Sequence, residues 1–333
     1  LIFSLIITFI FLIFSKDISS FIFKTDKYYY VIILLSFIHL FMTFNNIVKS
    51  VANGFKETRI FVKSEIIGII LAIPIIYILI KEYNFTGAIF SLMIIYIATF
   101  IPSFYYYKKS MYSKLLNCSI NFKYNYSKLY KFSIMTLVTA IVWPIVEITI
   151  RQMIIDNVGY ELAGIWQASL KLSHVYLGFF GIFLASYFVP IISPEKNIFN
   201  IKKKILIYSL YLVLLYIFGA GVFYIYRNFF IELLFSNEFN LLSDVIYLQL
   251  IGDMFKILSF IIGFVYVAKA FIKLYIVMEI TQAILLISIT KYLYLNDLNF
   301  ISIYQAYIVS NITFYTITLI VTYKYFRKDN ICL

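Results

Sequence analysis

The sequence predicts an all-α protein that crosses a membrane many times. Of its 333 residues, 63% are hydrophobic and only 13% are charged, and the mean hydropathy is +0.92. Soluble domains carry about 25% charged residues, so this composition is typical of a chain embedded in lipid. Apolar runs of about 20 residues, the length at which a helix spans a bilayer, recur along the whole chain.

Ten apolar runs are predicted to form membrane-spanning helices. They lie approximately at 1–14, 29–52, 60–80, 86–107, 129–153, 162–192, 204–226, 244–268, 273–295 and 301–325. The first run is too short to span comfortably, and no initiator Met precedes it. We therefore expect an N-terminally truncated piece of a protein with about twelve spans.

A long basic connection divides these runs into two groups. It extends from Lys108 to Lys128 and is the expected boundary between two helical lobes. We place an incomplete N-terminal lobe at 1–115, with about four spans, and a C-terminal lobe at 116–333, with about six. If each lobe is a repeat of about six spans, two helices are missing from the first lobe.

Lysine and arginine fill every second connection between the predicted spans, and the connections between them carry acids or little charge. The basic connections lie near residues 49–63, 108–131, 196–204, 269–273 and 324–328. By the positive-inside rule these connections are cytoplasmic, which predicts that both ends of the sequence lie in the cytoplasm. The net charge of +12 is spread over these connections, so nucleic-acid binding is not expected.

Helices of the second lobe carry ionisable residues in close helical pairs. The pairs are Glu147 with Arg151, Lys171 with His174, and Asp253 with Lys256. A charge near the bilayer centre costs about 2.5 to 3.5 kcal/mol on insertion scales, so these residues are expected to face a wet or paired interior. This pattern predicts a transport path.

Several stretches of the second lobe also carry motifs of a known transporter family. They run from GIWQA through KLSHVYL to SYFVP at 164–190, from LFSNEF to QLIGDMFK at 234–256, and from AKAFIKLY to EITQ at 268–282. In order and spacing they resemble the Wzx-type polysaccharide flippases, particularly the lipid III flippases of enterobacterial common antigen, in the multidrug/oligosaccharidyl-lipid/polysaccharide exporter superfamily. The likeness covers roughly residues 129–327 and is thinner upstream.

The resemblance implies a MATE-like fold with two helical lobes around a central cleft. It also implies a flippase of the bacterial inner membrane. Such a protein moves an undecaprenyl-pyrophosphate-linked oligosaccharide, an O-antigen unit of lipopolysaccharide or a related surface glycan unit, from the cytoplasmic to the periplasmic leaflet by alternating access. The expected partners are this substrate, membrane lipids, and a glycan polymerase with its chain-length regulator.

Gln167, Lys171 and His174 lie on one helical face, at positions i, i+4 and i+7. The face is predicted to line the substrate path, with Lys171 holding the lipid pyrophosphate as a point charge. The alternative is that Lys171 and His174 extend to the water interface. Where related flippases often have Asp after the Ser of this helix, this chain has His174, so the role of that Asp is not carried over.

Glu147 and Arg151 are spaced so that they either neutralise each other or line the path and exchange partners when substrate or a proton arrives. Arg151 lies near the predicted periplasmic end, which suits a late binding position. The same two readings apply to Asp253 and Lys256.

Glu279 lies near the start of the next helix and is a further candidate for charge pairing or coupling. Lys269 and Lys273 are expected to contact either the substrate headgroup or membrane lipids.

The candidate residues within the spans carry three positive and three negative charges, with His174 neutral. The positive residues are Arg151, Lys171 and Lys256, and the negative residues are Glu147, Asp253 and Glu279. Because these charges cancel, proton uptake by a carboxylate is expected to be coupled to substrate binding.

Two other functions remain open at this point. A cation-coupled multidrug exporter of the same superfamily would be expected to have an acidic cavity, whereas the acids here are matched by bases. A membrane-embedded glycan polymerase or ligase would need a large periplasmic loop, and the predicted periplasmic connections are short. The sequence has no Walker glycine loop, no His-Glu-x-x-His motif and only two histidines, so no cofactor, metal or catalytic residue is expected.

Overall fold

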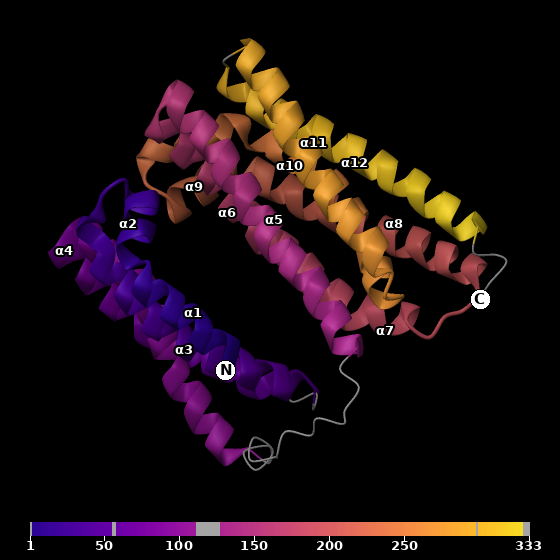
Figure 1. Cartoon of the computed structure of the whole chain (residues 1–333). Coiled ribbons are helices and arrows are strands. Elements are labelled where there is room, and N and C mark those ends of the chain that lie inside the picture. The colour runs from indigo at the N-terminus through magenta and orange to yellow at the C-terminus, as the bar shows by residue number, and fades with distance from the viewer. Residues whose placement is uncertain (1, 55–57, 111–126, 298, 329–333) are drawn as a thin grey trace. The chain divides into compact units, whose positions relative to one another are not determined.

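The structure is a computed structural model that describes the chain except residues 1, 55–57, 111–126, 298 and 329–333 (Figure 1). Every element in the described part is helical, which confirms the predicted all-α class. Nine helices among the described residues are long and apolar enough to cross a membrane, and a bent helix pair near the N-terminus raises this number to ten if it forms one span. The chain is therefore a multi-pass membrane protein.

The chain separates into two compact units, Leu1–Lys123 and Tyr124–Leu333. The predicted lobe boundary at 115/116 lies outside the described residues and stays a prediction, as does the cleft between the lobes. The helices of the first unit are α1 (Ile2–Ile13), α2 (Ser15–Phe23), a short 3-10 turn (Asp26–Tyr28), α3 (Tyr29–Gly54) and α4 (Thr58–Lys109). Helices α1 and α2 meet at an angle of 78°, and the bend lies at the end of the partial span predicted at 1–14.

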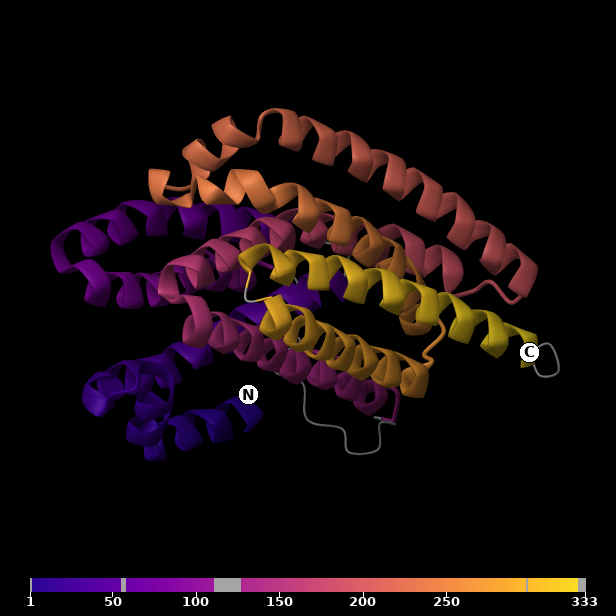
Figure 2. The same cartoon turned by 90° about the horizontal axis from the view of Figure 1, so that it is seen from above.

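Helix α4 contains the two predicted spans 60–80 and 86–107 as an antiparallel pair (Figure 2). The chain reverses at Asn84, whose φ of 48° and ψ of −123° interrupt the helix. Asparagine tolerates positive φ better than most residues, which suits it to this turn. Across the pair, Ser103 donates a hydrogen bond of 3.3 Å to Ser64.

The second unit contains the longer set of helices. They are α5 (Ser127–Val158), α6 (Tyr160–Phe183), a π-helical segment (Leu184–Phe188), α7 (Val189–Ile192), α8 (Ile198–Ile225), α9 (Arg227–Leu234), a 3-10 turn (Asn237–Phe239), α10 (Leu241–Ala268), α11 (Ile272–Asp297) and α12 (Phe300–Lys328). Helix α6, the π-helical segment and α7 together form the span predicted at 162–192.

Five helices of this unit form a closed ring. Helix α5 packs on α6, α6 on α10, α10 on α12, α12 on α11, and α11 returns to α5. Helix α8 packs against α10 from outside the ring, and Figure 2 shows it along one edge of the unit. The ring positions the inward-facing side chains of five different helices around one interior.

Candidate functional site

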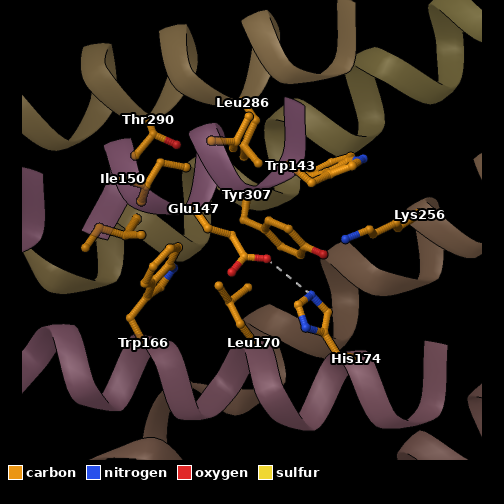
Figure 3. A pocket seen from close by; sticks show the side chains of 12 residues that line it. Trp143, Glu147, Ile150, Trp166, Leu170, His174, Lys256, Leu286, Thr290 and Tyr307 are labelled. Atoms are coloured by element: carbon orange, nitrogen blue, oxygen red, sulfur yellow. Dashed lines mark ion pairs between the residues drawn. The ribbon is translucent and has the colours of Figure 1, made fainter. Parts of the chain in front are cut away.

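Two cavities lie inside the helix ring of the second unit. The larger has a volume of about 530 Å³ and the smaller about 30 Å³. Both are lined by Trp143, Glu147, His174 and Lys256, and the larger is also lined by Glu279 and Gln282. The smaller cavity has room for about one or two water molecules. Ionisable side chains from α5, α6 and α10 therefore line both cavities (Figure 3), and Glu279 on α11 lines the larger one.

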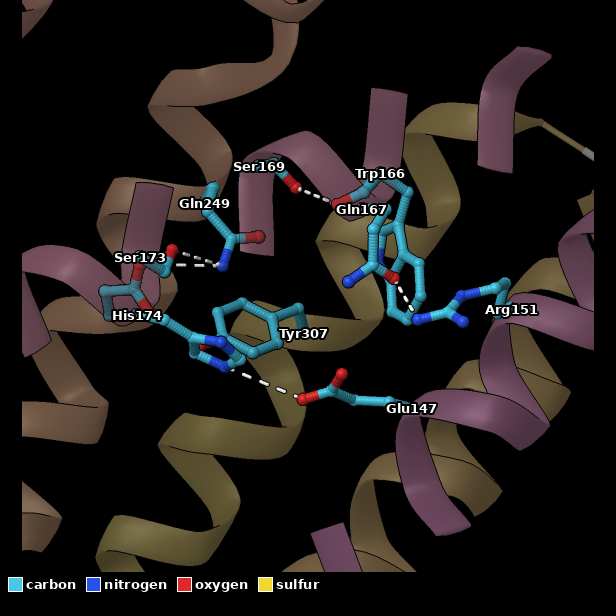
Figure 4. A network of polar contacts seen from close by, with 10 residues as sticks. Glu147, Arg151, Trp166, Gln167, Ser169, Ser173, His174, Gln249 and Tyr307 are labelled. Atoms are coloured by element: carbon cyan, nitrogen blue, oxygen red, sulfur yellow. Dashed lines mark hydrogen bonds and ion pairs between the residues drawn. The ribbon is translucent and has the colours of Figure 1, made fainter. Parts of the chain in front are cut away.

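Glu147 and Arg151 on α5 have partners on α6, not each other. The Glu147 carboxylate lies 3.6 Å from Nε2 of His174, and the Arg151 guanidinium donates a hydrogen bond to the side-chain oxygen of Gln167 (Figure 4). No ion pair within 4 Å joins Glu147 to Arg151 in the described part of the chain. Of the two readings of this spacing, a direct pair is not what the structure shows, because the packing of α5 on α6 supplies another partner to each residue.

Asp253 is fully buried, with 0% of its surface exposed. Its carboxylate accepts hydrogen bonds from Ser173 Oγ at 2.6 Å, from the Tyr307 hydroxyl at 2.5 Å, and from the Tyr176 hydroxyl. Gln249 in turn donates to Ser173 at 2.9 Å. Hydrogen bonds to a charged acceptor are stronger than those between neutral groups, so this cluster ties α6, α10 and α12 together.

Lys256 follows Asp253 by three residues but does not pair with it. Its ammonium lies 5.0 Å from the ring centre of Trp143 and 5.7 Å from that of Tyr307, within the range of about 6 Å over which a cation is attracted to an aromatic face. Only 8% of the residue is exposed. No carboxylate in the described residues lies within 4 Å of its ammonium, although Asp253, Glu147 and Glu279 are near enough to interact with it electrostatically.

Glu279 on α11 is held in place by α5. One of its carboxylate oxygens accepts a hydrogen bond of 2.9 Å from the indole nitrogen of Trp143. One turn earlier on both helices, the hydroxyls of Thr139 and Tyr275 are 3.0 Å apart. These side chains line the larger cavity, and the contacts fix the direction in which the Glu279 carboxylate faces it.

Comparison with known proteins gives relatives in both sequence and fold. The chain is 25% identical over 293 residues to the lipid III flippase of Escherichia coli (strain K12), an alignment that covers 87% of this chain and 70% of that protein. The lipid III flippase of Shigella flexneri matches with the same values. The predicted resemblance to these flippases is therefore confirmed, although no family model matches the chain.

A solved structure of a multidrug resistance MATE family transporter of the MOP superfamily, in an outward-facing conformation, superposes with a TM-score of 0.72 at 11% identity. The match covers 100% of this chain and 77% of that one. The chain has the fold of a MATE transporter.

Other predicted site residues of this MATE-fold chain lie away from the cavities. Lys171 is exposed and lines neither cavity. Lys269 follows α10 and donates hydrogen bonds to the backbone carbonyls of Ser193, at 3.2 Å, and Glu195. Partial burial lowers the pKa of Lys269, an effect opposed by the nearby Glu195 carboxylate. The roles of Lys171 and Lys269 in substrate binding stay predictions.

The structure also adds residues that sequence reasoning missed. Trp143 lies four residues before Glu147 on the same face of α5, a spacing that was visible in the sequence. Tyr307 carried no comparable signal, because it is one of 31 tyrosines in a strongly aromatic chain. Its partner Asp253 lies 54 residues away in sequence, so only the packing of α12 on α10 identifies it.

Proposed function

We propose that the chain is a flippase that moves an undecaprenyl-pyrophosphate-linked oligosaccharide from the cytoplasmic to the periplasmic leaflet of the bacterial inner membrane. The observation that carries the proposal is Lys256, which faces a cavity inside the helix ring and has no ion pair among the described residues. The likeness to lipid III flippases over 87% of the chain supports the choice of a lipid-linked glycan as substrate.

In this mechanism the ammonium of Lys256 binds the pyrophosphate. A lysine suits a phosphate as a compact point charge. In a cavity of low dielectric constant, the attraction is stronger than it would be in water. The aromatic rings of Trp143 and Tyr307 hold the ammonium without neutralising it, which keeps the site ready for an anion.

His174 and Glu147 supply a second polar contact at the same place. Their side chains are 45% and 26% exposed, so both are accessible from the cavities that they line. A protonated His174 would add positive charge for the substrate, and Glu147 would then hold that proton in place. Proton uptake at this pair is the proposed link between the proton gradient and substrate binding.

In the proposed mechanism of alternating access, other residues contact the substrate at other stages of transport. Arg151, tied to Gln167, and the exposed Lys171 would contact the headgroup at other stages of its passage. The polyprenyl tail stays in lipid while the headgroup crosses. Both ends of the chain are proposed to lie in the cytoplasm because the basic connections lie on that side. A polymerase and a chain-length regulator would take up the product, an O-antigen or related glycan unit.

Complementation tests the function. The complete gene is expressed in cells that lack their own lipid-linked oligosaccharide flippase, in several glycan backgrounds, and surface glycan is measured. Wild type is expected to restore the glycan and Lys256→Ala to lose it at equal membrane abundance. Lys291→Ala on α11 is the matched control, because Lys291 is exposed, lines neither cavity and is not a candidate for substrate binding. Full activity of Lys256→Ala would contradict the proposed role of this lysine.

A multidrug exporter is the second candidate. The larger cavity carries two carboxylates, Glu147 and Glu279, beside aromatic rings, a combination that attracts organic cations. The positive charge of Lys256 would repel an organic cation in this cavity. Failure to restore any glycan, together with gained resistance of the host to cationic drugs, would favour the exporter over the flippase.

A further inference from the structure

The wall of the larger cavity around Glu279 is not used by the pyrophosphate site. Glu279 and Gln282 lie about one helical turn apart on α11, and both line this cavity. Neither is needed to hold an anion at Lys256. An inference about this wall rests on the proposed function, because it concerns the part of the substrate next to the pyrophosphate.

Trp143 separates the positive and negative groups of the cavity. Its indole nitrogen donates to Glu279 at 2.9 Å, whereas its ring centre lies 5.0 Å from the ammonium of Lys256 (Figure 3). No ion pair within 4 Å joins Glu279 to Lys256 in the described residues. One indole side chain therefore keeps a carboxylate and an ammonium apart, so that each can contact a different part of one ligand.

The two charges select different chemical groups. A pyrophosphate is attracted to Lys256 and repelled by the carboxylate of Glu279. An ionised carboxylate only accepts hydrogen bonds, and with Trp143 and Tyr275 as donors the Glu279 carboxylate retains capacity for further ones. The group beside the pyrophosphate must therefore supply hydroxyl or amide hydrogens. The amide of Gln282 can both donate to such a group and accept from it.

We propose that Glu279, with Trp143 and Gln282, forms a subsite for the sugar ring attached to the pyrophosphate, and that the subsite selects a sugar without a carboxylate. A neutral hexose or an N-acetylated aminosugar offers hydroxyl and amide donors to Glu279. A hexuronic acid brings a second carboxylate against it and is disfavoured. Specificity here comes from repulsion of the wrong sugar as well as from hydrogen bonds to the right one.

Binding measurements on the purified full chain in lipid nanodiscs test the subsite. The probes are undecaprenyl pyrophosphate, the same lipid carrying one N-acetylhexosamine, and the same lipid carrying one hexuronic acid. Wild type is expected to bind the N-acetylhexosamine lipid about tenfold more tightly than the hexuronic acid lipid, which corresponds to about 1.4 kcal/mol.

Glu279→Gln is expected to reduce this preference to about twofold or less, since the repelling charge is removed. The variant keeps an oxygen that can accept the hydrogen bond from Trp143, so its fold should be unchanged. Its affinity for undecaprenyl pyrophosphate should be equal to or higher than that of wild type, because a charge that repels the anion is removed. Glu232→Gln is the matched control, because it removes an exposed carboxylate of the same unit on α9. Trp143→Phe, which removes the donor that positions Glu279, is expected to weaken the preference by a smaller factor.

The outcomes separate the subsite from the function on which it rests. If wild type and Glu279→Gln bind all three probes with the same ratios, the subsite is overturned and the flippase proposal stands. If wild type does not bind undecaprenyl pyrophosphate, or if Lys256→Ala binds it as well as wild type does, the pyrophosphate site fails and the subsite fails with it. Loss of the preference in Glu279→Gln alone supports the subsite.

Discussion

The two units of the chain use different polar groups between their helices. In the first unit neutral side chains meet between the helices, such as Ser4 with Thr43 at 2.8 Å and Asn45 with Thr99 at 3.0 Å. An ion pair of this unit, Lys49 with Glu65, lies near the helix ends, where the two side chains are 31% and 29% exposed. In the second unit, Asp253 joins three helices and Lys256 faces a cavity. Neutral hydrogen bonds hold membrane helices together at little cost, so the charges of the second unit indicate a requirement beyond packing.

The size of the insertion cost supports this interpretation. A buried charge costs about 2.5 to 3.5 kcal/mol at the centre of a membrane helix, whereas an interhelical hydrogen bond gains on average about 0.6 kcal/mol. Hydrogen bonds alone would not favour Asp253 over the neutral groups that serve the first unit. We infer from this difference between the units that the second unit retains its charged residues for substrate binding. Variants in both units test this inference.

Asp253→Leu is expected to have the largest effect on stability. The change leaves the hydroxyls of Ser173, Tyr176 and Tyr307 without their acceptor, and a buried group without a partner costs about 1 to 3 kcal/mol. We expect the free energy of unfolding, measured in mixed micelles, to fall by about 3 kcal/mol in total because the hydroxyls can partly pair with one another. Asp253→Asn keeps an acceptor oxygen and should lose less. Equal stability of Asp253→Leu and wild type would contradict the role of this cluster.

Alanine at two glycines is expected to affect the two units differently. A Cβ at Gly68 in the first unit would lie 2.5 Å from Cα of Thr99, whereas one at Gly252 in the second would lie 2.4 Å from the ring of Tyr307. A backbone atom can move away from an added methyl group less easily than a side chain can. Gly68→Ala should therefore lower the free energy of unfolding by about 1 to 3 kcal/mol.

Gly252→Ala should lose less stability but more transport activity, because it moves the Tyr307 ring that contacts both Asp253 and Lys256. Gly219→Ala on α8 is the control, since a Cβ there would meet no atom within 4 Å and the residue lines neither cavity. Unfolding in micelles and glycan restoration in cells measure the two effects. If Gly252→Ala lowered stability but left transport at the wild-type level, the proposed role of the second unit's charged cluster in transport would be contradicted.

Asn45→Ala is expected to have a modest effect that is confined to stability. Asn45 is buried and donates to Thr99 across the α3–α4 contact, a bond worth on average about 0.6 kcal/mol in membrane proteins. Transport should be unchanged at equal membrane abundance. The exposed neighbour Asn46 gives the control variant Asn46→Ala. Loss of glycan restoration in a stable, abundant Asn45→Ala protein would show that the first unit also contacts substrate.

Glu195→Gln is expected to have the smallest effect, because this charge lies outside the membrane spans. A hydrogen bond from Lys204 and the backbone N–H of Asn197 lower the pKa of Glu195 from 4.5 to about 2. A lowered pKa means that the ionised pair stabilises the fold at pH values above 4.5 and that this contribution is lost as the pH falls toward 2. The variant should therefore melt slightly below wild type at pH 7, with the difference disappearing in strong acid. A difference that grows as the pH falls would contradict this assignment.

The membrane class and the approximate spans were predictable from the amino-acid sequence. Apolar runs give helices because a backbone in lipid must satisfy its own hydrogen bonds, and the break between the runs 60–80 and 86–107 corresponds to Asn84 in the structure. The ionisable residues Glu147, His174 and Lys256 were also identifiable, since a charged or titratable side chain is unusual in an apolar helix.

Which of these residues contact one another depends on how the helices pack. Helical spacing brings Glu147 near Arg151 and Asp253 near Lys256, but His174, Tyr307 and other groups from neighbouring helices lie closer to the atoms concerned. A side chain on a helix can turn toward its own helix or toward a neighbour, and the energies of the two contacts are similar until packing fixes the neighbour. The sequence therefore identified the charged residues, whereas the ring of helices determined their partners and left Lys256 without an ion pair in the described part of the chain.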